Sequence, residues 1–177
     1  GIMGGSMAHE YLAPCDAGEN EVAICERGDY YANVEAAVSA PRAPEHPEEL
    51  GRPVEVETPG TTTIDALASL LGIDPAATSK AMPVTRADGV VVLALVRGDD
   101  RLEPNKLDGA IGQPSRPSTD EEIREAFGAS GGSLGPVGFA GEIIADEALR
   151  DGQYVAGANR DGWHLRGVEA GRDYTPR

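Results

Sequence analysis

The stretch Lys80-Ala-Met-Pro-Val-Thr-Arg-Ala-Asp-Gly-Val-Val-Val-Leu-Ala-Leu-Val96 decides the fold of this 177-residue chain. Two apolar segments, residues 80–85 and 90–96, flank the turn sequence Ala87-Asp88-Gly89, a pattern typical of a β-hairpin. The second segment is apolar on both faces, which predicts a central strand. Lys80 opens the first strand and is one of only two lysines beside thirteen arginines. Taken alone, it is either a surface lysine with its stem on the sheet or a cation placed at a cleft.

Patterns on either side of this hairpin predict further elements around the same sheet. A helix is expected to begin at Thr62, with Asp65 three residues later as a capping box, and to end at Gly72. Asp74-Pro75 predicts a short helix that leads into Lys80. Further helices are expected at 104–111, 118–128 and 145–149, and further strands at 137–144, 153–157 and 163–168. We therefore expect an α+β fold with a mixed β-sheet.

The first third of the chain has a different composition. Residues 40–59 contain five prolines and many charges, which predicts an extended linker without a core. Residues 1–57 carry twelve acidic and three basic side chains, so most of the net charge of −15 precedes the patterned region. Nonspecific adhesion to nucleic acid needs clustered Lys and Arg, so this composition argues against it. A nucleic-acid end held at a small site remains compatible with the sequence.

Several classes of protein are disfavoured by what the sequence lacks. Cys15 and Cys25 have no CxxC spacing and the three histidines are scattered, which predicts reduced thiols and no metal site. No Gly-x-Ser-x-Gly elbow and no P-loop are present, so a serine hydrolase and a P-loop NTPase are not expected. No apolar run of about 18 residues and no signal-peptide pattern occur. We therefore expect no membrane association and a cytoplasmic location.

Two later segments are candidates for a binding site. The loop Gly132-Ser-Leu-Gly-Pro136 has glycines that let the backbone approach a ligand and present N–H groups to an anion. Gly157-Ala-Asn-Arg-Asp-Gly-Trp-His164 combines a tight turn with the one histidine of the patterned region. Trp163 is expected to pack in the core, on the strand face opposite His164. Each segment alone is also compatible with a structural role, as a glycine-rich connection or a hydrogen-bonded histidine.

Four segments in this order resemble the YbaK-like aminoacyl-tRNA editing domain. They are Thr78-Ser-Lys80, Leu95-Val-Arg-Gly-Asp99, Gly132 to Pro136 and Gly157 to His164. The likeness covers residues 58–170 and implies the fold of that family, a mixed, partly barrel-like sheet flanked by helices. One departure is Leu102-Glu103-Pro104-Asn105-Lys106, where the family commonly has a Leu-Asn-Glu run before a lysine. Glu103 in place of the asparagine changes the local hydrogen bonding.

The front of the chain resembles another part of bacterial prolyl-tRNA synthetases. Gly4 to Glu10 and Gly28 to Glu35 are similar to the catalytic-domain stretch that precedes their inserted editing domain. The resemblance implies four parts, which are a truncated piece of a class II catalytic domain at 1–40, a Pro-rich linker at 41–57, the editing domain at 58–170 and a return linker at 171–177. It also implies that the fragment itself does not aminoacylate.

The activity implied by the resemblance is hydrolysis in cis of alanine wrongly esterified to tRNA(Pro). A synthetic site for proline also admits alanine, since each missing methylene is worth only about 1–3 kcal/mol in discrimination, and a second, smaller pocket can remove the error. The implied partners are the aminoacylated 3′ end of the tRNA and the rest of the synthetase chain, in a parent enzyme expected to be a homodimer. Editing is expected to need no cofactor, whereas the parent uses ATP and Mg²⁺.

Residue roles also follow from the resemblance. The catalytic group would comprise Lys80, His164 and the loop residues Gly132, Ser133, Leu134, Gly135 and Pro136; the substrate-binding group would comprise Asp146, Gly157, Ala158 and Asn159. Lys80 is expected to pair with phosphate or the terminal ribose, and the loop N–H groups to polarise the ester carbonyl. No general base is evident, so we expect a water assisted by the ribose hydroxyl. Two alternatives stay open: a deacylase for another small or cysteinyl group, and a tRNA-binding appendage without hydrolysis.

Overall fold

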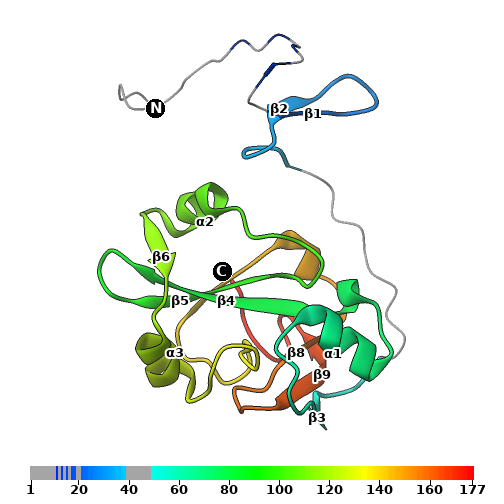
Figure 1. Cartoon of the computed structure of the whole chain (residues 1–177), viewed down its shortest axis with the longest axis vertical. Coiled ribbons are helices and arrows are strands. Elements are labelled where there is room, and N and C mark those ends of the chain that lie inside the picture. Colours follow the sequence, from blue (N-terminus) through cyan, green and yellow to red (C-terminus); the bar gives the residue numbers. More distant parts are fainter. Residues whose placement is uncertain (1–10, 12, 14, 16, 19–20, 39–48) are drawn as a thin grey trace. The chain divides into compact units, whose positions relative to one another are not determined.

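The computed structural model describes residues 11, 13, 15, 17–18, 21–38 and 49–177 (Figure 1). They fall into two units, residues 1–38 and 39–177, and each is described by itself. The segment Gly4 to Glu10, expected to belong to a catalytic domain, lies outside the described residues, as do residues 41–48 of the expected linker.

Within its described residues, the first unit contains one small hairpin. Strands β1 (Val22–Ile24) and β2 (Tyr31–Asn33) pair antiparallel, with Ala23 opposite Ala32. Gly28, with φ of 72°, closes the turn by donating its N–H to the Cys25 carbonyl at 2.8 Å. A left-handed residue at this point explains why glycine occupies the turn.

A four-stranded sheet forms the centre of the second unit, in the order β6-β4-β5-β7. Strands β4 (Ser79–Arg86) and β5 (Val91–Arg97) make the expected hairpin, with Lys80 opposite Val96. Strand β6 (Ser115–Pro117) adds antiparallel to β4, and β7 (Glu142–Ala145) adds parallel to β5. The prediction that the apolar run after the turn is a central strand is therefore confirmed.

A second sheet has three strands in the order β3-β9-β8. They are β3 (Val54–Glu57), β8 (Gln153–Gly157) and β9 (Trp163–Glu169). Residues 54–57 were expected to be linker, which is wrong, because they pair with β9 from Val54 opposite Arg166 to Glu57 opposite Trp163. The described strands form separate sheets and no closed barrel, and one isolated bridge, Thr78 to Val155, connects the two sheets of this unit.

Capping side chains define the helices. Helix α1 (Ile64–Leu71) begins after Thr63, whose hydroxyl accepts from the Ala66 N–H, so the expected cap at Thr62 is wrong by one residue. Helix α3 (Asp120–Phe127) has the expected capping box between Thr119 and Glu122. The remaining helical segments are α2 (Pro104–Ile111), η1 (Pro75–Ala77) and η2 (Glu147–Leu149). The strand expected at 137–144 begins only at 142, because Phe139 N–H turns back to the Pro136 carbonyl at 3.2 Å.

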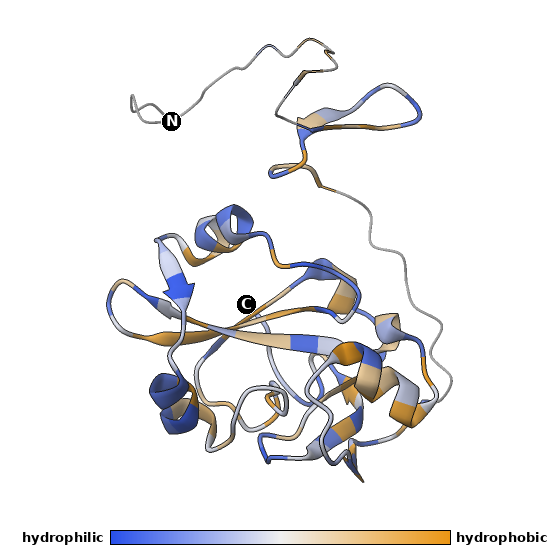
Figure 2. Cartoon of the chain, viewed as in Figure 1, coloured by the Kyte–Doolittle hydropathy of each residue, from blue (hydrophilic) through white to orange (hydrophobic). Residues whose placement is uncertain are grey.

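The hydrophobic core lies on both faces of β5. Leu93 and Leu95 pack with Phe127, Leu149 and Tyr154 on one face. The alternate residues of the same strand pack on the other face in a second cluster, which comprises Val84, Val92, Ala94, Leu107 and Ile111. Figure 2 shows the apolar colours along β4 and β5 and hydrophilic colours on α3. Burial on two faces is the reason that β5 reads as a continuous apolar run.

The first described residues of the second unit are tied to its C-terminal part. Leu50 donates its N–H to Gln153 Oε1 at 2.7 Å and accepts from Gln153 Nε2 at 2.8 Å. Arg172 Nη1 also donates to the Leu50 carbonyl, at 2.9 Å. A Cβ on Gly167 would lie 2.8 Å from the Leu50 Cβ, so the absence of a side chain at 167 makes room for the incoming chain. Leu50 is thereby attached to residues that adjoin the C-terminal segment.

Candidate active site

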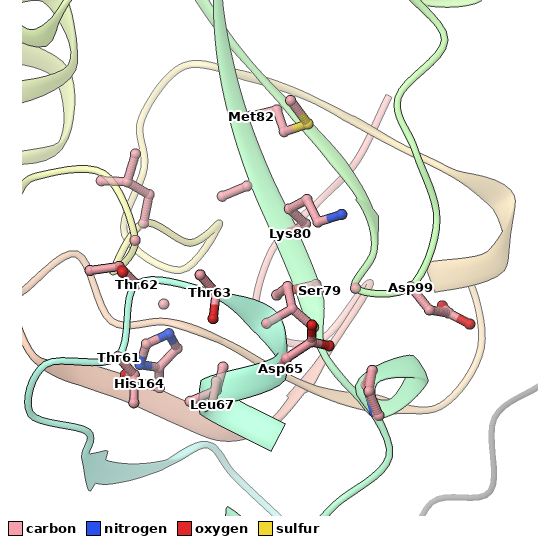
Figure 3. Close-up of a pocket in the computed structure, with 17 residues that line it drawn as sticks. Thr61, Thr62, Thr63, Asp65, Leu67, Ser79, Lys80, Met82, Asp99 and His164 are labelled. Atoms are coloured by element: carbon pink, nitrogen blue, oxygen red, sulfur yellow. The ribbon is translucent and has the colours of Figure 1, made fainter. Parts of the chain in front are cut away.

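A cleft of about 680 Å³ lies among α1, the start of β4, the Gly132 loop and β9 (Figure 3). The segment before α1 and the helix itself contribute Thr61, Thr62, Thr63, Ile64, Asp65 and Leu67. The hairpin region contributes Pro75, Ser79, Lys80, Ala81, Met82, Gly98 and Asp99. Of the residues predicted for the site, the cleft brings together Lys80, Gly132, Leu134, Gly157 and His164. Four segments that are distant in sequence therefore meet at one cavity.

Lys80 is held at the edge of this cleft. Its side chain is partly buried, and its ammonium donates a hydrogen bond to the Asp100 backbone carbonyl at 2.9 Å. In Figure 3 the ammonium points toward the loop that carries Asp99. An ammonium has three donors, so two N–H groups stay available for a ligand. The contact orients the lysine without using up its capacity to bind.

His164 is buried on β9, with 5% of its surface exposed. Its Nδ1 lies 2.6 Å from the hydroxyl of Thr58, which is itself fully buried. Burial lowers the pKa of His164, and a hydrogen bond to the Gly132 backbone partly opposes that shift. A lowered pKa keeps the imidazole neutral at pH 7. The histidine is therefore a neutral, positioned group that links β9 to the glycine-rich loop.

The loop at 132–136 packs directly on the end of β8. A Cβ on Gly135 would lie 2.0 Å from the Gly157 carbonyl oxygen, which no side chain could occupy. Asn159, with φ of 52°, accepts from the Gly135 N–H at 2.8 Å and donates to the Gly135 and Val137 carbonyls at 3.1 and 2.9 Å. Ser133 Oγ accepts from the Gly162 N–H at 3.1 Å. The hairpin turn thus fixes the shape of the loop.

Three backbone N–H groups of the loop make no hydrogen bond within the described part of the chain. Among the described residues, the N–H groups of Gly132, Ser133 and Leu134 have no acceptor, although Ser133 and Leu134 are only 5% and 6% exposed. Buried N–H groups without a partner are rare in proteins. Gly135 donates to Asn159 and the fully buried Pro136 has no N–H, so these two residues do not supply donors as expected. The arrangement can stabilise an oxygen that becomes negatively charged.

Other predicted residues lie outside the cleft. Asp146 caps η2 by accepting from the Ala148 N–H at 2.9 Å, and its own N–H donates to the Leu95 carbonyl. It borders two smaller clefts, of about 290 and 430 Å³. The cause is β7, which runs parallel to β5 and places Asp146 next to Leu95. Ala158 donates its N–H to the Trp163 carbonyl at 3.1 Å and serves the turn.

Trp163 does not occupy the core as expected. It is partly exposed, and the guanidinium of Arg160 lies over its ring at 3.9 Å from the centroid. Arg160 also pairs with Glu55 at 2.9 Å. The indole at the start of β9 is therefore covered by the turn that precedes it.

Sequence reasoning missed the residues that the segment before α1 and the Gly98 turn contribute. The run Thr61-Thr62-Thr63 was visible, but nothing local indicated that it faces β4. Gly98 is equally informative, since a Cβ there would lie 1.9 Å from the Thr78 hydroxyl.

Asp99 accepts from Arg97 at 2.6 Å, whereas Asp65 has no ion pair or hydrogen bond within the described chain. The cleft therefore contains one unpaired carboxylate.

The described residues contain neither a candidate metal site nor a membrane-spanning helix. No group of three or more His, Cys, Asp or Glu side chains that could hold a metal ion occurs among the described residues. Within the same part of the chain, no helix has the length and apolar character needed to cross a membrane.

Comparison with known proteins adds relatives of this chain. A family model described as the aminoacyl-tRNA editing domain matches residues 58–174. The chain is 44% identical over 177 residues to a proline--tRNA ligase of Anaeromyxobacter sp. and 39% identical over 176 residues to that of Chromobacterium violaceum. Each match covers 98% of this chain and 31% of the relative, so the chain spans about a third of the length of these relatives.

Solved structures share the fold of the second unit. One, described as a putative trans-editing enzyme for prolyl tRNA synthetase, is 28% identical with a TM-score of 0.58. The match covers 64% of this chain and 74% of the other. A second structure, described as a hypothetical protein, has a TM-score of 0.59 at 24% identity over 64% of this chain and 79% of the other, and it supports the fold alone.

Proposed function

Since the chain belongs to the aminoacyl-tRNA editing domain family, we propose that it hydrolyses alanine wrongly esterified to tRNA(Pro). It would act in cis, as the editing part of a proline–tRNA ligase. The observation that carries the proposal is the cleft that Lys80, His164, Gly132 and Leu134 line together, next to a loop whose N–H groups at 132–134 have no acceptor among the described residues. These are the groups that an ester hydrolase needs to hold an acylated nucleotide and a developing oxyanion.

The apolar part of the cleft supports the proposed specificity for a small acyl group. Ile64, Leu67 and Ala81 line it, and Leu67 is only 2% exposed. A methyl side chain would pack against this wall, while the ring of proline needs additional volume. Exclusion by size discriminates strongly, because overpacking costs more than a missing contact does. The correct product, prolyl-tRNA, would therefore escape hydrolysis.

The proposed reaction is attack of a water oxygen on the ester carbonyl carbon. The carbonyl oxygen becomes an oxyanion that the N–H groups of Ser133 and Leu134 stabilise. Collapse of this intermediate breaks the bond between the carbonyl carbon and the ribose oxygen, which leaves with a proton. The neighbouring ribose hydroxyl relays the proton: it accepts one from the water and gives its own to the leaving ribose oxygen, so no protein base is required. The products are free alanine and uncharged tRNA, and a 2′-deoxy end would be hydrolysed far more slowly.

Lys80 would position the nucleotide in this scheme. With one N–H on the Asp100 carbonyl, the ammonium offers its other two to a phosphate or to the terminal ribose. His164 would hold the Gly132 loop through its backbone contact and stay neutral. Gly157 and Asn159 would support the loop from behind, whereas Asp146, which borders other clefts, would not touch the substrate.

The remaining proposals concern the parent protein. Residues 1–40 would be part of its catalytic domain, and residues 171–177 would return to it, with the editing unit beginning at β3. Editing would need no cofactor, whereas the parent would ligate proline with ATP and Mg²⁺ as a cytoplasmic homodimer. The fragment itself is expected to form no prolyl-tRNA.

One experiment tests the function and its specificity together. Release of amino acid is measured from alanyl-, cysteinyl- and prolyl-tRNA(Pro). The proteins assayed are the unsubstituted chain, here called the parent chain, and its variants Lys80→Ala and Lys106→Ala. Lys106 is the matched control, since it is the other lysine and borders a different cleft. The proposal expects hydrolysis of the alanyl ester alone, lost only in Lys80→Ala. Preferred hydrolysis of the cysteinyl ester would reassign the substrate, and a folded parent that hydrolyses none of them would indicate a tRNA-binding appendage.

A further inference from the structure

The proposed substrate carries one charged group that the site described so far leaves without a partner. The α-carbon of an aminoacyl ester bears a carbonyl, a side chain and an ammonium, which point in three directions. The carbonyl is directed to the Gly132 loop and the side chain to the apolar wall. An ammonium that enters a cleft loses hydration, so it needs an acceptor there.

Two carboxylates line the cleft, and they differ in their partners. Asp99 is engaged, since its Oδ1 accepts from Arg97 Nε at 2.6 Å. Asp65 has neither an ion pair nor a hydrogen bond within the described chain. Lys80, the nearby cation, is bound to the Asp100 carbonyl and forms no ion pair with Asp65. Asp65 is therefore the carboxylate with all its acceptor capacity available.

Asp65 lines the same cleft as the apolar wall. It lies in the first turn of α1, which also carries two residues of that wall, Ile64 and Leu67, and its side chain is exposed. Figure 3 shows Asp65 on α1 and Ser79 and Lys80 on β4 around the same cleft. A methyl group packed on Ile64 and Leu67 would leave the ammonium on the same carbon inside the cleft that Asp65 lines.

We infer that Asp65 is a specificity-determining residue that binds the α-ammonium group of the aminoacyl ester. The inference rests on the proposed function. Asp65 selects esters with a free, charged amine and helps to orient the α-carbon toward the loop N–H groups. The class of ligand is thus narrower than a small acyl ester: it is a small α-amino acid ester.

A local role for Asp65 must be separated from this one. A carboxylate in the first turn of a helix interacts favourably with the helix dipole, wherever that helix lies. Helix α3 offers a matched control, because Glu121 is its second residue as Asp65 is the second residue of α1. Glu121 is exposed and borders no described cleft. Substitution of Glu121 reports the dipole effect alone.

The test compares alanyl-tRNA(Pro) with lactyl-tRNA(Pro), in which a neutral hydroxyl replaces the ammonium at nearly the same size. The full chain is assayed as parent, Asp65→Asn, Asp65→Glu and Glu121→Gln, and thermal unfolding checks that each variant is folded. In Asp65→Asn, kcat/KM for the alanyl ester should fall about tenfold, as for the loss of a hydrogen bond to a charged group. Hydrolysis of the lactyl ester should stay unchanged, Asp65→Glu should recover part of the loss, and Glu121→Gln should resemble the parent.

The outcomes test the role of Asp65 separately from the proposed hydrolysis of the ester. A parent that hydrolyses neither ester refutes the proposed function itself. A parent active on the alanyl ester with Asp65→Asn equally active overturns the inference alone, and so does an equal loss on both esters, which assigns Asp65 to the chemical step. If the lactyl ester is too slow to measure in the parent, recovery by Asp65→Glu supports the inference and its absence refutes it.

Discussion

Gly157 lies so close to Leu134 that a Cβ at position 157 would be 2.2 Å from the Leu134 carbonyl oxygen. The contact joins the end of β8 to the loop that contributes Gly132 and Leu134 to the cleft. The position of the loop therefore depends on the lack of a side chain at 157.

Replacement of Gly157 by alanine should displace the loop and inactivate the site. We expect a loss of about 1–3 kcal/mol in the free energy of unfolding, as for other overpacked sites, together with loss of ester hydrolysis. Gly109→Ala on α2 is the control, because no atom lies within 4 Å of its added Cβ. That variant should be as stable as the parent or more stable. Urea unfolding and the deacylation assay measure both, and an active Gly157→Ala would show that the contact is dispensable.

Asn159 combines a left-handed backbone with three side-chain hydrogen bonds. Asn159→Gly should lose the hydrogen bonds but keep the backbone conformation, whereas Asn159→Ala should lose both. We expect each variant to be destabilised, and alanine to be worse than glycine by about 1 kcal/mol, since alanine tolerates a positive φ less well. Denaturant unfolding of the two variants side by side measures the difference. Equal stability would mean that the backbone relaxes at this turn.

His164 should make the fold sensitive to mild acid. Its pKa is lowered by burial, so below its ordinary value of 6.5 the unfolded chain takes up a proton that the folded chain resists. Stability then falls as the pH drops below about 6.5, because the unfolded state binds more protons. In His164→Gln, the loss of stability between pH 7 and pH 5 should be smaller than in the parent. Thermal unfolding across this range tests it, and parallel curves would contradict the expectation.

Glu122 should act in the same sense as His164, but at lower pH. Its hydrogen bond with Arg116, followed by that with the Thr119 N–H, lowers its pKa from 4.5 to about 2. Stability from the ionised carboxylate is therefore complete above pH 4.5 and is lost as the pH falls toward 2. Glu122→Gln should be less stable than the parent at pH 7, and the difference should shrink through this window. Glu125→Gln on the same helix, which has no partner in the described chain, should show no such difference.

Local signals in the sequence predicted much of this fold. The β4–β5 hairpin and the capping box of α3 were predicted correctly, because all their determinants lie within about ten residues. Strand β3 was missed because its partner, β9, is more than 100 residues away and Pro53 suggested a linker. The capping role of Thr63 was missed because Thr62 and Thr63 are equivalent in sequence.

The candidate site could be predicted only in part from the sequence. Lys80, Gly132 and His164 do meet at one cleft, which the family resemblance indicated and the chain order alone could not. Asp146 was misplaced, because β7 pairs with the edge of β5 opposite β4, which puts Asp146 across β5 from the strand that carries Lys80. The Asn159 side chain accepts from the Gly135 N–H and so removes that donor from the loop. No sequence pattern shows such a contact between residues 24 positions apart.

The attachment of Leu50 to Gln153 and Arg172 has a consequence for how the second unit can be joined to other chains. Its first described residues and its C-terminal part are held to one another by the unit's own side chains. We therefore expect the unit to keep its cleft whether its two ends are free or continue into longer chains.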